Sequence, residues 1–127
     1  LLQGVDGIEL HGNPDSRYDS NFWLCTITIN PKLHVAGQET AYDSPAKHLR
    51  PNNNVEAMRQ ALDAAGIESR PLWKPMHCQP VYAGNPSYVN GVSESLFRTG
   101  LCLPSGPCVS DDDVKRITDV IKGHIRH

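Results

Sequence analysis

The feature that most constrains the fold is a single apolar stripe near the end of the chain. Residues 110–126 read as an amphipathic helix, because apolar residues recur every three to four positions. The stripe consists of Val114, Ile117, Val120, Ile121 and Ile125. Ser110 suits an N-cap, and we interpret Asp111 to Asp113 as acids at the positive end of the helix dipole rather than a metal cluster. A helix with one apolar face needs a second layer to cover it.

Short strands are the candidates for that layer. Between residues 21 and 30, Cys25, Ile27 and Ile29 alternate with threonines, the pattern of a strand with one buried face. A shorter apolar stretch precedes this strand, and Ile67 to Arg70 and Leu101 to Leu103 are predicted as further short strands.

Two more helices are predicted between the strands. Apolar residues at helical spacing run from Val55 to Ala65, with Asn54 as a suitable N-cap and Gly66 at the C-terminal end. A helix is also predicted over Val92 to Thr99, ended by Gly100. The fold class is therefore α+β: a small sheet of short, largely antiparallel strands with helices packed on it.

Length and charge limit the function classes. The chain has 127 residues, 39% hydrophobic and 20% charged, which suits one domain spanning residues 1–127. Its formal net charge of −2 argues against nucleic acid as a partner. No apolar run approaches the roughly 20 residues of a membrane helix, so no membrane partner is expected. The chain opens at Leu1 without an initiator Met, and we expect a fragment cut at a domain boundary.

The cysteines favour a reducing compartment. Cys25, Cys78, Cys102 and Cys108 lack the spacing of a zinc knuckle, and a domain of this size does not need disulfides. We therefore expect free thiols and a cytoplasmic location. His124 and His127 are three residues apart, but we interpret them as solvated residues near the end of the chain rather than metal ligands.

Two segments are predicted as loops. Residues 32–54 are polar and rich in Gly, Pro and Asn, and a loop of that length is usually functional or mobile. Residues 70–80 place Arg70, Trp73, Lys74 and His77 among several prolines. Prolines fix the backbone, so these side chains could bind an anionic ligand carrying a ring. The alternative is a rigid connector that buries Trp73 in the core and leaves the charges in water.

The same loop carries a family resemblance. Residues 66–77, Gly-Ile-Glu-Ser-Arg-Pro-Leu-Trp-Lys-Pro-Met-His, followed by Gln-Pro-Val-Tyr at 79–82, closely resemble the C-terminal segment of the DegT/DnrJ/EryC1/StrS sugar aminotransferases. Residues 95–106, the closing helix and residues 21–24, where the small domain's opening strand would begin, are similar to that family in the same order. The Trp-Lys-Pro-Met-His variant is similar to members that make amino sugars for protein glycans, including pilin glycans, and for surface polysaccharides.

The resemblance implies the C-terminal small domain of the aspartate aminotransferase fold (type I pyridoxal phosphate enzymes). The family moves an amino group from glutamate to a nucleotide-linked 4-keto-6-deoxy sugar, or to the 3-keto position in some members. Pyridoxal phosphate would be held by a lysine of the large domain, which lies outside these residues, so the fragment is expected to be inactive alone. Family members are usually homodimers with shared active sites.

The resemblance also implies a role for the loop as part of the substrate wall. Trp73, Lys74 and His77 are expected to face the nucleotide sugar, and Arg70 to do so unless it pairs only locally. Lys74 is not the cofactor lysine. The 32–54 loop is longer than the family leads us to expect. An alternative to the enzyme is a non-catalytic regulatory or interaction module of the same fold.

Overall fold

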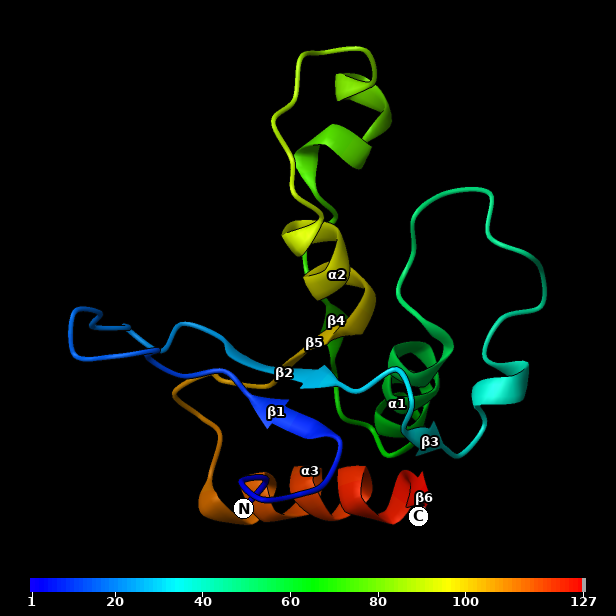
Figure 1. The fold of residues 1–127 in the computed structure, drawn as a ribbon. Helices are drawn as coiled ribbons and strands as arrows, with labels where there is room; N and C mark the ends of the chain where they lie inside the picture. The colour runs from blue at the N-terminus through cyan, green and yellow to red at the C-terminus, as the bar shows by residue number, and fades with distance from the viewer. Residues whose placement is uncertain (127) are drawn as a thin grey trace.

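A four-stranded antiparallel sheet forms the centre of the fold, in a computed structural model that describes residues 1–126 (Figure 1). The strand order is β1-β2-β5-β4. The strands are β1 (Ile8–Leu10), β2 (Cys25–Ile29), β4 (Arg70–Pro71) and β5 (Gly100–Leu103). The α+β class and the antiparallel pairing predicted from the sequence are confirmed.

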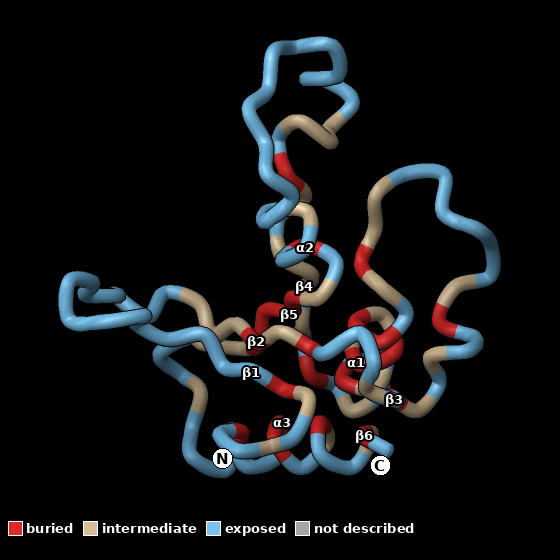
Figure 2. Tube along the Cα trace, in the orientation of Figure 1, coloured by how far each residue is buried: buried red, intermediate tan, exposed pale blue. Residues whose placement is uncertain are grey.

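Two helices close the core. Helix α1 (Asn53–Ala64) packs against α3 (Asp111–His124) and against β4 and β5, whereas α2 (Val92–Thr99) contacts β2 and α1. Figure 2 shows that the buried residues gather at this junction. The largest fully buried side chains are Ile27, Ile29, Met58, Leu62, Leu101, Ile121, Val35 and Val55. Ile117 and Ile121 of the predicted stripe are buried, whereas Val114 is exposed. Within α3 the stripe therefore packs only in its central part, and Ser110 forms the predicted cap as a capping box with Asp113.

The segment 32–54 is more ordered than predicted. It contains β3 (His34–Val35), which pairs with β6 (Ile125–Arg126), and the 3-10 turn η1 (Gln38–Thr40). The last helix accordingly ends at His124, where the chain turns into β6 instead of continuing the helix to residue 126. His124 Nδ1 donates a hydrogen bond to the Val120 carbonyl at 2.8 Å, and His127 lies outside the described residues.

Asn54 holds the start of this segment on the helix. Its side chain is buried, and its Nδ2 atom donates to the carbonyls of Asn30, Pro31 and Leu33 at 3.2, 3.3 and 2.6 Å. The N-cap predicted at Asn54 is wrong, because Asn52 takes that role by accepting from the Val55 N–H. Asn54 lies inside the helix, and the carbonyls of the turn after β2 supply the hydrogen-bond partners that its buried amide needs.

The strand predicted over residues 21–30 is shorter than expected. It begins at Cys25, because Phe22 adopts a left-handed backbone with φ of 51°, which breaks an extended conformation. The strand predicted from Ile67 also begins later, at Arg70. The segments that precede these two strands are therefore loops.

The exposure of Trp73 excludes one of the two interpretations of residues 70–80. The Trp73 side chain is 66% exposed, so the interpretation that buries it in the core is wrong.

All four cysteines are free, as expected, and burial raises the pKa of the Cys25 and Cys102 thiols. Within residues 1–126, no helix has both the length and the apolar character needed to cross a bilayer.

Replacing Asn54 with Ala should lower the free energy of unfolding by about 1 to 3 kcal/mol, because three carbonyls lose their buried donor. Urea denaturation measures the loss. The control is Asn53→Ala, whose exposed Nδ2 donates only to the Gln38 carbonyl and whose loss should cost about 1 kcal/mol or less. Equal losses in the two variants would contradict the role given to Asn54.

Replacing Trp73 with Ala should change the free energy of unfolding by less than about 1 kcal/mol, because its ring is mostly in water. Phe97→Ala is the matched aromatic control. That ring is buried in α2, and its removal should cost about 3 to 5 kcal/mol. A loss at Trp73 as large as that at Phe97 would restore the core interpretation.

Candidate functional site

The loop between β4 and α2 is held in shape by prolines and short hydrogen-bonded turns. It contains the 3-10 turns η2 (Met76–Cys78) and η3 (Pro80–Tyr82). The Cys78 N–H donates to the Pro75 carbonyl at 2.9 Å, and the Gln79 side-chain amide donates to the Lys74 carbonyl at 2.9 Å. We call residues 70–80 the proline loop. Because its φ angles are restricted at three prolines, its backbone loses little further freedom when a ligand binds.

The base of the proline loop depends on a glycine. Leu72 packs against Gly100, where an added Cβ would collide with the Leu72 side chain and with the Leu96 carbonyl. The close approach of β4 and β5 therefore requires a residue without a side chain at position 100. This contact fixes the point at which the chain leaves the sheet, directly before Trp73.

Trp73 forms a pair with Trp23, from the loop that precedes β2. The ring centroids are 6.0 Å apart and the planes are tilted by 38°, a geometry that aromatic rings favour. Both rings are largely exposed, at 66% and 70%. Ser105 donates from its hydroxyl to the Trp23 carbonyl at 3.0 Å and thereby ties that loop to the end of β5. The tryptophan pair offers a flat apolar surface to a ring.

The two basic residues of the loop differ in their contacts. Arg70 is exposed and donates from Nε and Nη2 to Glu68 Oε1 at 2.8 and 2.6 Å, so its charge is paired locally. Lys74 is half-buried and has no carboxylate within ion-pair distance among residues 1–126. The ammonium group of Lys74 is therefore unpaired, whereas the guanidinium of Arg70 is not.

His77 contacts a carboxylate from the neighbouring helix. Its Nε2 lies 2.8 Å from Glu94 Oε1 in the first turn of α2, and the side chains are 20% and 37% exposed. The contact joins η2 to α2 and fixes the orientation of the imidazole. With His77 as neutral donor at Nε2, Nδ1 is the ring nitrogen left to accept a hydrogen bond.

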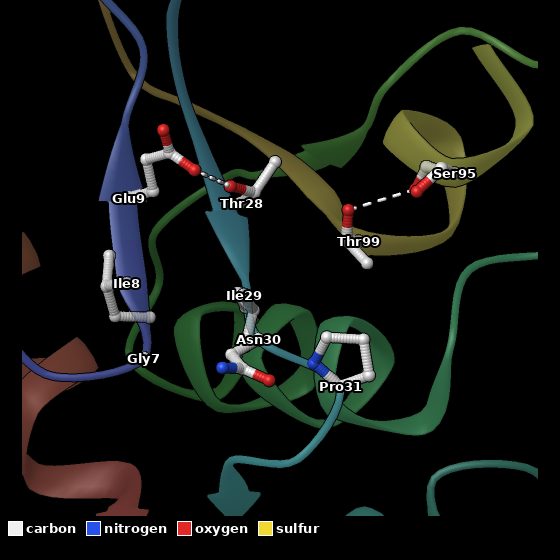
Figure 3. Close-up of a pocket in the computed structure, with 9 residues that line it drawn as sticks. All are labelled: Gly7, Ile8, Glu9, Thr28, Ile29, Asn30, Pro31, Ser95 and Thr99. Carbon is white, nitrogen blue, oxygen red and sulfur yellow. Dashed lines mark hydrogen bonds between the residues drawn. The ribbon is translucent and has the colours of Figure 1, made fainter. Parts of the chain in front are cut away.

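A separate hollow of about 420 Å³ lies between the first two strands and α2 (Figure 3). Glu9 accepts from the Thr28 hydroxyl at 3.5 Å there, and Thr99 donates to the Ser95 carbonyl at 2.9 Å. None of the four residues predicted as substrate-binding lines it. The proline loop and this hollow are distinct surfaces.

Two residues of the site were not recognised from the sequence. Trp23 was assigned to a strand. It lies 50 positions from Trp73, so the sequence gives no signal that the two side chains are in contact. Glu94 occupies the first turn of a helix, where an acid is ordinarily explained by the helix dipole. Only the tertiary structure brings these two residues to the loop.

The described residues do not form a pyridoxal phosphate site by themselves. That cofactor is held through a lysine in a cavity. Four of the five lysines are exposed, and Lys74 is half-buried but lines none of the hollows found in residues 1–126. No step of a reaction on that cofactor is therefore assigned to these residues.

Comparison with known proteins explains the architecture. Residues 5–122 match the sequence profile of the DegT/DnrJ/EryC1/StrS aminotransferase family. The chain is 34% identical over 112 residues to EpsN of Bacillus subtilis, named as a pyridoxal phosphate-dependent aminotransferase. It is 39% identical over 96 residues to the GDP-perosamine synthase of Caulobacter vibrioides. These matches cover 85% and 76% of this chain but only 24% and 21% of the relatives.

Solved structures that resemble this chain are also aminotransferases. A DegT DnrJ EryC1 StrS aminotransferase from Brucella abortus aligns with a TM-score of 0.65 and 27% identity, over 94% of this chain and 26% of that one. The aminotransferase TlmJ from Streptoalloteichus hindustanus shares the fold, with a TM-score of 0.69 over 97% of this chain and 27% of its own, at 19% identity. The chain thus spans about a quarter of the length of these proteins. With the profile matched over nearly its whole length, the chain belongs to the DegT/DnrJ/EryC1/StrS aminotransferase family.

Proposed function

We propose that this chain is the C-terminal small domain of a pyridoxal phosphate-dependent sugar aminotransferase with the aspartate aminotransferase fold. The whole enzyme transfers an amino group from glutamate to a nucleotide-linked 4-keto-6-deoxy sugar, for surface polysaccharide or protein glycan synthesis. It acts in the cytoplasm as a homodimer. The proline loop supplies part of the wall that binds the nucleotide sugar. The observation that carries this proposal is a rigid loop that presents Trp73, Lys74 and His77 together.

The chemistry of the three side chains suits such a ligand. The tryptophan pair can stack on a planar base or on the apolar face of a sugar. The free ammonium of Lys74 can pair with a phosphate oxygen. The fixed imidazole of His77 can exchange a hydrogen bond with a sugar hydroxyl. Arg70 has a smaller part, because its guanidinium is already engaged by Glu68.

Exposed apolar side chains on the projecting loops support a larger parent protein. Residues 72–91 and 11–24 extend away from the core (Figure 2). They carry large apolar residues that are at least half exposed: Tyr18, Phe22, Trp23, Trp73, Met76, Val81, Tyr88 and Val89. Apolar surface of this extent usually marks a contact with another body. In the proposed enzyme, that body is the large domain or the second subunit.

The cofactor belongs to the remainder of the enzyme in this proposal. Pyridoxal phosphate carries the amino group between the two substrates when it is bound. This chain's residues bind and orient the sugar, and exclude water from it. The relative named as a pyridoxal phosphate-dependent aminotransferase supports the choice of cofactor, and the GDP-perosamine synthase supports a nucleotide sugar as substrate.

A non-catalytic regulatory or interaction module is the second candidate. The observation that suits it is the set of exposed apolar side chains on the projecting loops, because an interaction module also needs such a surface for its partner. The two candidates differ in the complete protein. An enzyme gains a visible absorbance band with pyridoxal phosphate that borohydride removes with labelling of one lysine, whereas a module without the lysine gains none.

The 127-residue chain alone should not transaminate. With glutamate, pyridoxal phosphate and a GDP- or UDP-linked 4-keto-6-deoxyhexose, no amino sugar should form above the reaction without protein, because the chain has no lysine placed to hold the cofactor. Mass spectrometry of the nucleotide sugars measures the product. Turnover by this chain would show that the assignment of the cofactor to another domain is wrong.

Trp73→Ala and His77→Ala in the complete enzyme should slow the half-reaction with the nucleotide sugar by about tenfold or more. That is the loss of roughly one hydrogen bond or one stacking contact. The half-reaction with glutamate should be nearly unchanged. Single-turnover assays measure the amino sugar formed and the 2-oxoglutarate released.

The matched control is His34→Ala. His34 also contacts a glutamate through Nε2, at 3.4 Å from Glu39 Oε1, but it lies in β3 beside the C-terminus (Figure 1). Both half-reactions should survive this change. Equal slowing of the two half-reactions by Trp73→Ala and His77→Ala would contradict the substrate wall.

A further inference from the structure

Three potential metal ligands meet where the proline loop contacts α2. His77, Cys78 and Glu94 each offer one ligand atom, and these atoms all lie within 4.8 Å of one another. All three residues are half-buried. Among residues 1–126, they form the one group of three His, Cys, Asp or Glu side chains that is compact enough to hold a metal ion.

The backbone presents these ligands from fixed positions. His77 and Cys78 are consecutive in η2, which the Cys78 N–H closes onto the Pro75 carbonyl, and Glu94 lies in the first turn of α2. The 2.8 Å contact between His77 Nε2 and Glu94 Oε1 already joins the two elements. Preorganised ligands lose little conformational freedom when a metal binds.

The geometry needs only small side-chain shifts. Ligands around a tetrahedral zinc ion at about 2.0 to 2.3 Å lie roughly 3.3 to 3.7 Å from one another. His77 Nε2 and Glu94 Oε1, now 2.8 Å apart, would separate by about half an ångström. The widest of the three ligand distances, which is no more than 4.8 Å, would shorten by about 1 Å at most. Both changes are within reach of a rotation about side-chain bonds.

The donor set selects the metal. One imidazole nitrogen, one thiolate sulfur and one carboxylate oxygen suit Zn²⁺, whereas Mg²⁺ and Ca²⁺ prefer oxygen alone. The geometry points to a Zn²⁺ site formed by His77, Cys78 and Glu94, with water in the fourth position. On binding, the Cys78 S–H bond breaks, its proton passes to the buffer and a zinc–sulfur bond forms. The His77 ring proton moves from Nε2 to Nδ1 through the solvent, so that the Nε2 lone pair binds zinc. This site does not depend on the reaction proposed above.

Cobalt reports the thiolate ligand directly. Titration of the 127-residue chain with Co²⁺ should produce a near-ultraviolet band of thiolate-to-cobalt charge transfer that saturates at one ion per chain. Addition of Zn²⁺ should then remove the band, because the same site binds zinc more tightly. A chain that develops no such band would overturn the proposal.

Matched variants identify the ligands. Cys78→Ser should abolish the band, whereas Cys108→Ser, which alters an exposed thiol outside the group, should leave it intact. Glu94→Gln should weaken cobalt binding by at least about tenfold, and Glu39→Gln should leave it unchanged. Far-ultraviolet circular dichroism checks that each variant is folded.

Two results would contradict this assignment. A band that persists at full strength in Cys78→Ser would place the thiolate elsewhere. If Cys78→Ser does not fold, the isosteric Glu94→Gln decides, because unchanged affinity in that variant would also overturn the site.

Discussion

The fold depends on one buried amide. Asn54 Nδ2 donates to the carbonyls of residues 30, 31 and 33, where the chain leaves β2 and turns towards β3. The Asn54 amide is buried and needs partners, and the carbonyls of this turn supply them beside the N-terminal part of α1. One side chain within the helix therefore joins the end of the sheet, the start of segment 32–54 and α1. The pairing of β3 with β6, which ends the last helix, follows from where that turn is held.

The candidate site uses rigidity at the edge of the sheet. Gly100 lets Leu72 pack closely, and prolines fix the chain after it, so Trp73, Lys74 and His77 project from a loop that has little freedom. Partners from elsewhere complete the surface: Trp23 lies beside Trp73, and Glu94 contacts His77. Because Glu94 contacts His77, it also lies close to Cys78, and the three residues form a group of potential metal ligands. A core of α1, α3 and the sheet supports this partly exposed loop.

Patterns within one element were predictable. Four local features were read correctly, because each depends on residues close in sequence. They are the central part of the stripe of α3, its cap at Ser110, the bounds of α2 and the alternation in β2. The errors lie where distant segments compete with local preference. Asn54 was assigned as a cap, but long-range carbonyls take its amide, and β2 loses its first residues to the turn at Phe22. Segment 32–54 looked irregular because two-residue strands such as β3 have no periodicity.

By itself, the sequence determined the α+β class, the helices and the family resemblance that the profile match bears out, since local periodicity and contiguous motifs carry that information. It also brought Arg70, Trp73, Lys74 and His77 to attention as residues of one loop. Only the tertiary structure decided that Trp73 is exposed, that Arg70 is paired with Glu68 while Lys74 is free, and that Glu94 reaches His77 and Cys78. The exposure of Trp73 and the contact of Glu94 with His77 depend on how β4, β5 and α2 pack around Gly100, and contacts between such distant segments have no signature in adjacent residues.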